Sequence, residues 1–212
     1  MTEAFPPFSV DVPEGFHELP LGTEGDERIR SVANLVQEVY PQAGPQVWQQ
    51  VAPMFAGATA MMADAELSFA AIGLFGDGPE KVAQCALTLA VAPSNHPTAE
   101  VAALGIREIL ARTDTVEAEY LELPCGPAVT GISITEVTYG AEYTASGEPA
   151  TVRMGRLQAY VPFPAAPYLA VLTLDTPAMD YWENFSVMMG TLLMGIEFHE
   201  VADPDEQMGA SL

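Results

Sequence analysis

The last quarter of the chain constrains the fold more than any other segment. Between Thr151 and Phe198, two β-rich runs, TVRMGRLQAYVPF and YLAVLTLD, flank a proline-rich turn. An amphipathic helix is predicted over residues 180–194, capped by Asp180, and a short strand, GIEFHEV, follows it. The side chains expected to face inward on this helix are Tyr181, Trp182, Phe185, Met188, Met189 and either Leu192 or Leu193. This order indicates a helix packed against an antiparallel sheet.

The first third of the chain combines a short strand with two helices. Residues 8–16 are predicted to form a strand that enters a turn at 13–15. Asp26 is the expected N-cap of the first helix. The apolar stripe of this helix is formed by Ile29, Val32, Leu35, Val36 and Val39. A second helix is expected over residues 46–64, where Pro53 predicts either a kink or two separate pieces.

The middle of the chain is rich in strands. Residues 67–75 and 81–91 flank the sequence Gly-Asp-Gly-Pro, which predicts a hairpin. Two further strands, VEAEYLELP and AVTGISITEVTY, are joined through residues 125–127, and a polar loop is expected over residues 140–149.

A third helix is predicted between these strand pairs, over residues 97–113. Its cap is Ser94, Asn95 or Thr98, since Pro97 suits the first turn of a helix. The side chains expected to form its buried side are Val101, Leu104, Ile109 and Leu110.

Because the strands follow one another instead of alternating with helices, the fold class is α+β with a single antiparallel β-sheet covered by helices. The run YLAVLTL is apolar on both faces, which favours helices on both faces of the sheet. We expect one domain over residues 1–212 and a flexible acidic tail over residues 202–212.

Charge is the most unusual feature of the composition. The 212 residues include 29 acidic and 7 basic side chains, for a formal net charge of −22, and Lys81 is the only lysine. Such a field repels polyanions, so we expect no nucleic-acid partner, and it attracts a protein partner with a basic patch. The same charge also keeps an apolar-rich protein in solution, which is the alternative explanation. The longest apolar runs are too short for a membrane span.

Both ends of the chain resemble the Mog1/PsbP-like superfamily. The similar segments are FSVDVPEGF, at the first strand and turn, and YLAVLTLDTPAMDYWENFSVMMGTLLMGIEF, at the closing strand, helix and strand. The resemblance implies an α-β-α sandwich and a binding or accessory role. It assigns no catalytic residue, because no catalytic set is shared across that superfamily.

The sequence contains no motif that predicts a cofactor or metal. The Gly-rich, P-loop, nucleophile-elbow, zincin and EF-hand patterns are all missing. Gly73, Gly76 and Gly78 lie between two strands and indicate a turn. The three histidines, His17, His96 and His199, lack the spacing of zinc ligands, and we expect neither a metal nor a cofactor.

Several acidic side chains are candidates for acid–base chemistry. Glu117 and Glu119 share a face of one predicted strand, with Glu122 nearby, and a solvated strand face is the simpler interpretation. The sequence DPDE at residues 203–206 is interpreted as part of a charged tail, since it lacks the ligand spacing of a calcium loop.

Arg153 and Arg156 lie three positions apart on one predicted strand and therefore point to opposite faces. Because acidic residues outnumber basic ones, we expect one arginine to pair with a carboxylate, and anion binding is the alternative. Cys85 and Cys125 are expected to be reduced core thiols, although one disulfide is possible. The runs MFAGATAMM and VMMGTLLM either fill the core or line an adaptable groove.

These features favour a cytoplasmic, non-enzymatic binding or accessory protein that contacts another protein. Two other classes stay open. One is a hydrolase-type enzyme that uses carboxylates with His17 or His199, and the other is an extracytoplasmic binding protein presented without its leader.

Overall fold

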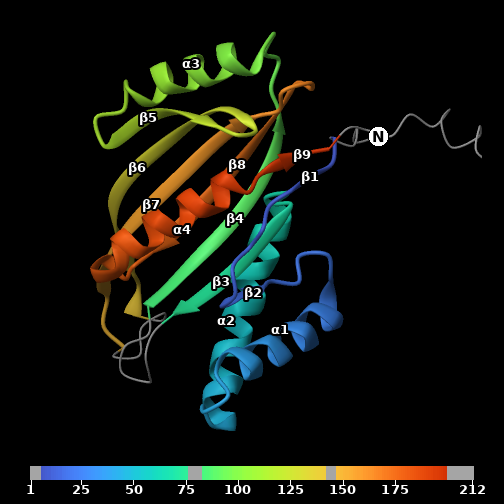
Figure 1. The fold of residues 1–212 in the computed structure, drawn as a ribbon. Coiled ribbons are helices and arrows are strands. Elements are labelled where there is room, and N and C mark those ends of the chain that lie inside the picture. The colour runs from blue at the N-terminus through green and yellow to red at the C-terminus, as the bar shows by residue number, and fades with distance from the viewer. Residues whose placement is uncertain (1–5, 76–82, 142–146, 200–212) are drawn as a thin grey trace, which may run out of the picture.

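The computed structural model describes residues 6–75, 83–141 and 147–199. Seven strands form one antiparallel sheet in the order β2-β3-β4-β8-β7-β6-β5, and β1 and β9 form a separate pair (Figure 1). The strands are β1 (Phe8–Ser9), β2 (Phe16–Glu18), β3 (Phe69–Phe75), β4 (Ala83–Pro93), β5 (Val116–Leu123), β6 (Gly126–Tyr139), β7 (Ala150–Pro162), β8 (Tyr168–Thr176) and β9 (Glu197–Phe198). The helices are α1 (Gly25–Val39), α2 (Pro45–Asp64), α3 (Ala99–Leu110), the short 3-10 helix η2 (Met179–Tyr181) and α4 (Trp182–Met194).

The α+β class predicted from the strand order is confirmed, but the single-sheet expectation is not. The closing strand β9 pairs with β1, with Phe8 opposite Phe198, instead of joining the large sheet. The rings of Phe8, Phe163 and Phe198 pack together and hold this pair against the loop between β7 and β8. The pair therefore brings the two ends of the described chain side by side (Figure 1).

The two faces of the sheet differ in character because the side chains of each strand alternate between them. One face, the packed face, is apolar in the central strands. It is formed there by Leu87 of β4, Leu172 and Leu174 of β8, and Leu157 and Ala159 of β7, all of them buried. The opposite face, the open face, carries Ala86 of β4, Thr173 and Asp175 of β8, and Arg156 and Gln158 of β7.

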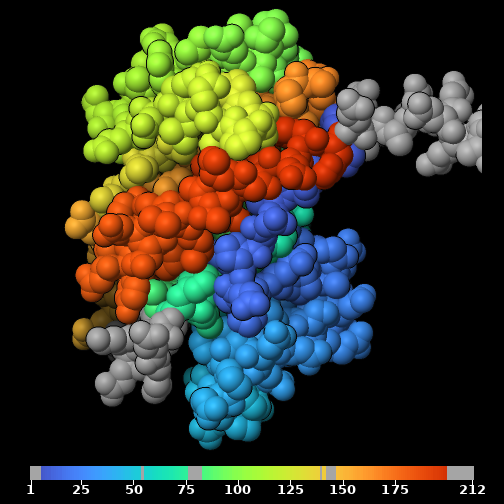
Figure 2. Space-filling view, in the orientation of Figure 1, coloured from blue at the N-terminus to red at the C-terminus, as the bar shows by residue number. Residues whose placement is uncertain are grey.

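Helix α4 covers the packed face (Figures 1 and 2). Phe185, Met189, Leu192 and Leu193 are buried, as predicted, and Trp182 packs at the edge of this core. Gly155 of β7 leaves room for the indole, since a Cβ at this position would lie 2.5 Å from Cζ3 of Trp182.

The predicted cap of α4 is wrong. Asp180 lies in η2, and the N-cap is Tyr181, which makes no side-chain capping bond. The tight turn of η2 therefore takes the place of a capping carboxylate at the entry to α4.

Two groups of helices cover the ends of the open face. Helix α3 lies over β5, β6 and β7, where Leu110 approaches Gly131. At the other end, α1 and α2 pack against each other, and α2 passes behind β3 in Figure 1. Tyr40 and Phe55 of this helical pair face Ile72 of β3 across a pocket.

The predicted buried side of α3 is largely wrong. Val101, Leu104 and Ile109 are 52%, 41% and 65% exposed, and the buried residues are Ala102 and Ala103. Small side chains let the helix approach β6, whose Gly131 meets it. Among the candidate caps, Thr98 is confirmed, since its hydroxyl accepts a hydrogen bond from the backbone N–H of Val101 at 3.3 Å.

Helix α1 also departs from the prediction at its start. Its N-cap is Glu24, and Asp26 lies in the first turn. Val32, Val36 and Val39 are buried as expected, but Ile29 is 57% exposed because it lines an outer groove between α1 and α2.

The hairpin of β3 and β4 is confirmed by their antiparallel register, and α2 runs through Pro53 as one helix. The expected turn at 76–79, Lys81, half of the loop at 140–149 and the tail at 202–212 lie outside the described residues.

We predict that Phe185→Ala destabilises the protein by about 3–5 kcal/mol, since it removes a ring at the centre of the contact between α4 and the packed face. Val187→Ala is the matched control, because Val187 is 66% exposed on the same helix, and its effect should stay within about 0.5 kcal/mol. Urea unfolding at equilibrium measures both, and equal effects of the two variants would contradict the packing described.

Candidate functional site

The central strands β4, β8 and β7 expose polar side chains on the open face, between α3 and the α1–α2 pair. The Arg156 side chain is 49% exposed and that of Asp175 is 26% exposed, although both lie near the middle of a seven-stranded sheet. We use the name open-face cleft for the polar side chains that form the floor of this region, Arg156, Gln158, Tyr160, Thr173 and Asp175, together with the pocket that Asp175 lines. An antiparallel sheet commonly packs one face on the core and leaves the other in contact with water, and the polar open face fits this pattern.

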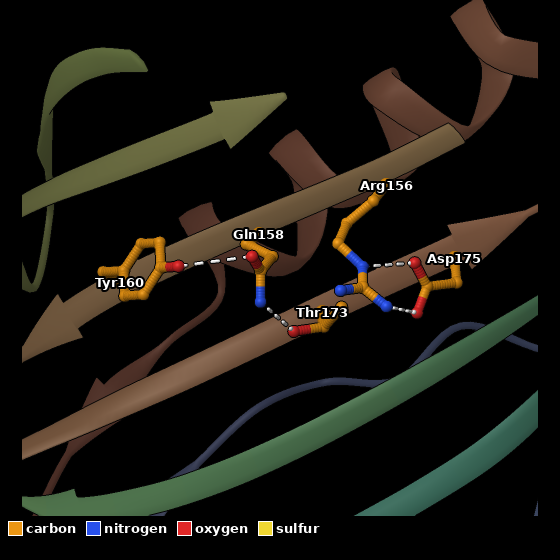
Figure 3. A network of polar contacts seen from close by, with 5 residues as sticks. All are labelled: Arg156, Gln158, Tyr160, Thr173 and Asp175. Atoms are coloured by element: carbon orange, nitrogen blue, oxygen red, sulfur yellow. Dashed lines mark hydrogen bonds and ion pairs between the residues drawn. The ribbon is translucent and has the colours of Figure 1, made fainter. Parts of the chain in front are cut away.

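A directional hydrogen-bond chain runs along this floor (Figure 3). The Tyr160 hydroxyl donates to Oε1 of Gln158 at 3.2 Å, and Nε2 of Gln158 donates to Oγ1 of Thr173 at 3.1 Å. The chain ends at Thr173, whose own hydroxyl hydrogen donates to no group among the described residues.

Arg156 and Asp175 form an ion pair beside this chain. Nε of Arg156 donates to Oδ1 of Asp175 at 2.7 Å, and Nη2 donates to Oδ2 at 3.0 Å. The hydrogen bond that the guanidinium donates to Asp175 raises the pKa of Arg156, so the guanidinium stays charged. The expectation that one of the two arginines pairs with a carboxylate is confirmed, and Arg153 lies on the packed-face side, opposite Glu136 of β6.

An apolar pocket of about 530 Å³ opens at one end of the cleft. Its apolar lining includes Phe55, Ile72, Ala86, Met154 and Pro177, and its polar lining includes Tyr40, Gln84 and Asp175. Burial raises the pKa of the Tyr40 hydroxyl, which is therefore a neutral hydrogen-bonding group at neutral pH. This volume lies in the range of ligand pockets, so the pocket takes a small molecule or a few side chains of a peptide.

The Cys85 thiol lies on the packed face, beside Gly73, Phe16 and Phe75, and is unsuited to nucleophilic chemistry. Cys85 is free and buried, and burial raises its pKa from 9.0 to about 12. Because the thiolate is the reactive form, Cys85 is inert at neutral pH. Cys125 is also free and half-buried, so neither thiol is in a disulfide.

The histidines do not converge on the cleft. His17 lies 3.5 Å from Glu38, His96 contacts Ser94 and the carbonyl of Phe163, and His199 contacts Ser9. Within the described residues, no three His, Cys, Asp or Glu side chains are grouped so as to hold a metal.

The other candidates lie away from the cleft. Glu117, Glu119 and Glu122 are exposed on the edge strand β5, where Glu122 accepts from the Tyr120 hydroxyl at 2.7 Å. The DPDE run at 203–206 lies outside the described residues. Of the methionines in the two Met-rich runs, Met189 fills the core, whereas Met61 and Met194 are 75% and 59% exposed.

The sequence analysis missed Gln158, Tyr160 and Thr173. A signal was present, since polar residues occupy alternate positions of β7 and β8 between apolar ones. The two-residue spacing puts them on one face, but only the register of β7 against β8 brings Gln158 opposite Thr173.

None of the described helices is long and apolar enough to cross a membrane. Comparisons of this chain with protein-family models, with curated proteins and with solved structures give no match.

We predict that Cys85 resists alkylation by iodoacetamide at pH 8 in the native protein. With a pKa of about 12, only about one thiol in 10⁴ is ionised at that pH, and the side chain is buried. Cys125, which is half-buried, should react faster and serves as the internal comparison. Mass spectrometry of timed samples locates the label. Labelling of Cys85 at the same rate in native and urea-unfolded protein would contradict the burial of this thiol in the packed-face core.

Proposed function

We propose that this protein is a non-enzymatic binding or accessory protein that holds a segment of a partner protein in the open-face cleft. The observation that carries the proposal is the polar floor of Arg156, Asp175, Gln158 and Thr173 beside an apolar pocket. An apolar pocket with a few oriented polar groups is the usual form of a ligand site. The dispersed histidines support binding over catalysis.

The partner is a protein with a basic patch. The net charge of −22 accelerates encounters with basic surfaces and slows those with polyanions. Exposed ion pairs contribute little affinity, so the apolar pocket supplies most of the binding free energy once the partner has arrived.

We further propose that the fold is the α-β-α sandwich of the Mog1/PsbP-like superfamily and that the protein acts in the cytoplasm. Helices on both faces of an antiparallel sheet support the first proposal. Two free cysteines agree with the second, since thiols stay reduced in that compartment.

We predict that Ala86→Leu weakens capture of the partner at least tenfold, because the larger side chain fills the pocket against Ile72 and Asp175. Ala92→Leu is the matched control, since Ala92 lies on the same face of β4 but is exposed at its end. Native extract is passed over immobilised wild type and both variants, and quantitative mass spectrometry compares the retained proteins.

The salt dependence of the recovered interaction tests the electrostatic part. The association rate should fall steeply between low and physiological salt, while the dissociation rate changes much less. Recovery of nucleic acid, a salt-insensitive association rate, or equal capture by the Ala86→Leu and Ala92→Leu variants would refute the proposal.

A further inference from the structure

We infer that the open-face cleft recognises a neutral carbonyl group next to an apolar side chain, with Arg156 and Thr173 donating to the carbonyl and the pocket holding the side chain. The inference rests on the proposed function, because it specifies the chemistry of the partner segment. The partner thus presents an apolar residue beside a free main-chain carbonyl, with basic residues farther away.

Some hydrogen-bond donors of the floor make no bond to the described residues. The guanidinium of Arg156 uses Nε and Nη2 on Asp175, and its Nη1 nitrogen bonds no group in the described part of the chain. Thr173 accepts from Gln158, which fixes its oxygen and leaves its hydroxyl hydrogen available. The unused N–H groups of Arg156 and the Thr173 hydroxyl are thus held in place by the partners of the neighbouring atoms.

The unused donors of Arg156 and Thr173 face the same space. Arg156 pairs with Asp175 and Gln158 pairs with Thr173 in adjacent positions of the β7–β8 ladder. In Figure 3 the guanidinium nitrogen without a dashed line lies on the side away from Asp175, toward Thr173. An acceptor with two lone pairs, such as a carbonyl oxygen, satisfies two converging donors.

The donors lie next to the apolar pocket. Met154, which lines the pocket, precedes Arg156 on the same face of β7, and Asp175 belongs to both the pocket wall and the ion pair. Successive residues on one face of a strand lie about 7 Å apart. A carbonyl on Arg156 and an apolar side chain in the pocket are therefore within the reach of one peptide residue.

The charge of the site selects a neutral acceptor over a carboxylate. Asp175 already neutralises Arg156 at hydrogen-bond distance, and the chain as a whole carries −22. A carboxylate would bring a further negative charge beside Asp175, whereas an amide carbonyl accepts the same hydrogen bonds without that repulsion.

Capped amino acids test this assignment without knowledge of the partner. The probes are N-acetyl-phenylalanine methylamide, the corresponding free acid N-acetyl-phenylalanine, and N-acetyl-glycine methylamide. NMR titration follows the Met154 methyl and the Arg156 Nε–H signals. We expect saturable binding of the phenylalanine amide, with a Kd on the order of 1 mM for so small a ligand. The free acid should bind at least threefold more weakly, and the glycine amide should not saturate.

Substitutions at the floor test the donor role of Thr173. Thr173→Val should weaken the phenylalanine amide about fivefold, the loss expected for one hydrogen bond. Thr173→Ser should restore most of the affinity, because it keeps the hydroxyl. Thr138→Val is the matched control, since Thr138 is an exposed strand threonine on the opposite face. Circular dichroism melting confirms that each variant is folded.

The outcomes separate this inference from the proposed function. Tighter binding of the free acid, or equal binding by the Thr173→Val and Thr138→Val variants, overturns the carbonyl assignment. If no capped amino acid binds but capture of the partner still depends on Ala86, the inference is wrong and the proposed function stands. If capture of the partner is also unchanged by Ala86→Leu, the proposed function is wrong as well.

Discussion

The contact between α4 and the packed face is the interaction on which the rest of the structure depends. Phe185, Met189 and Leu192 pack in one core cluster with the buried leucines of β7 and β8, and this contact removes their apolar surface from water. The register of β7 against β8 determines which side chains point toward α4. Because side chains alternate along a strand, the residues between them point to the open face.

Among the described residues, no helix covers the centre of the open face, and its chemistry follows from that. Helix α3 and the α1–α2 pair lie at its two ends, and polar side chains occupy the space between. Burying a polar group costs free energy unless the group is hydrogen-bonded. The Arg156–Asp175 ion pair and the hydrogen-bond chain from Tyr160 through Gln158 to Thr173 supply such bonds among the side chains of the floor. The bonds to Asp175 and from Gln158 thereby orient the guanidinium of Arg156 and the hydroxyl of Thr173, which carry the remaining donors.

Much of the fold could be predicted from the sequence, because hydrophobic periodicity marks α4 and the strands independently of their neighbours. Periodicity failed at α3, because apolar residues lie on several sides of the helix and the buried ones are the small Ala102 and Ala103, while Val101, Leu104 and Ile109 are exposed. The cleft was predicted in one part only. That one of Arg153 and Arg156 pairs with a carboxylate followed from charge and strand period, but the choice of Arg156 did not. Gln158 and Thr173 meet through a register that spacing alone does not specify.

The central claim is that the middle of one sheet face is exposed while the opposite face is sealed by α4. Hydroxyl-radical footprinting with mass spectrometry tests it directly through two methionines on the two faces. Met154 lies on the open face and Met189, 1% exposed, lies under the packed face. The account predicts rapid oxidation of Met154 and protection of Met189 in the native protein. Equal protection of both methionines would show that the open face is covered and would contradict the account.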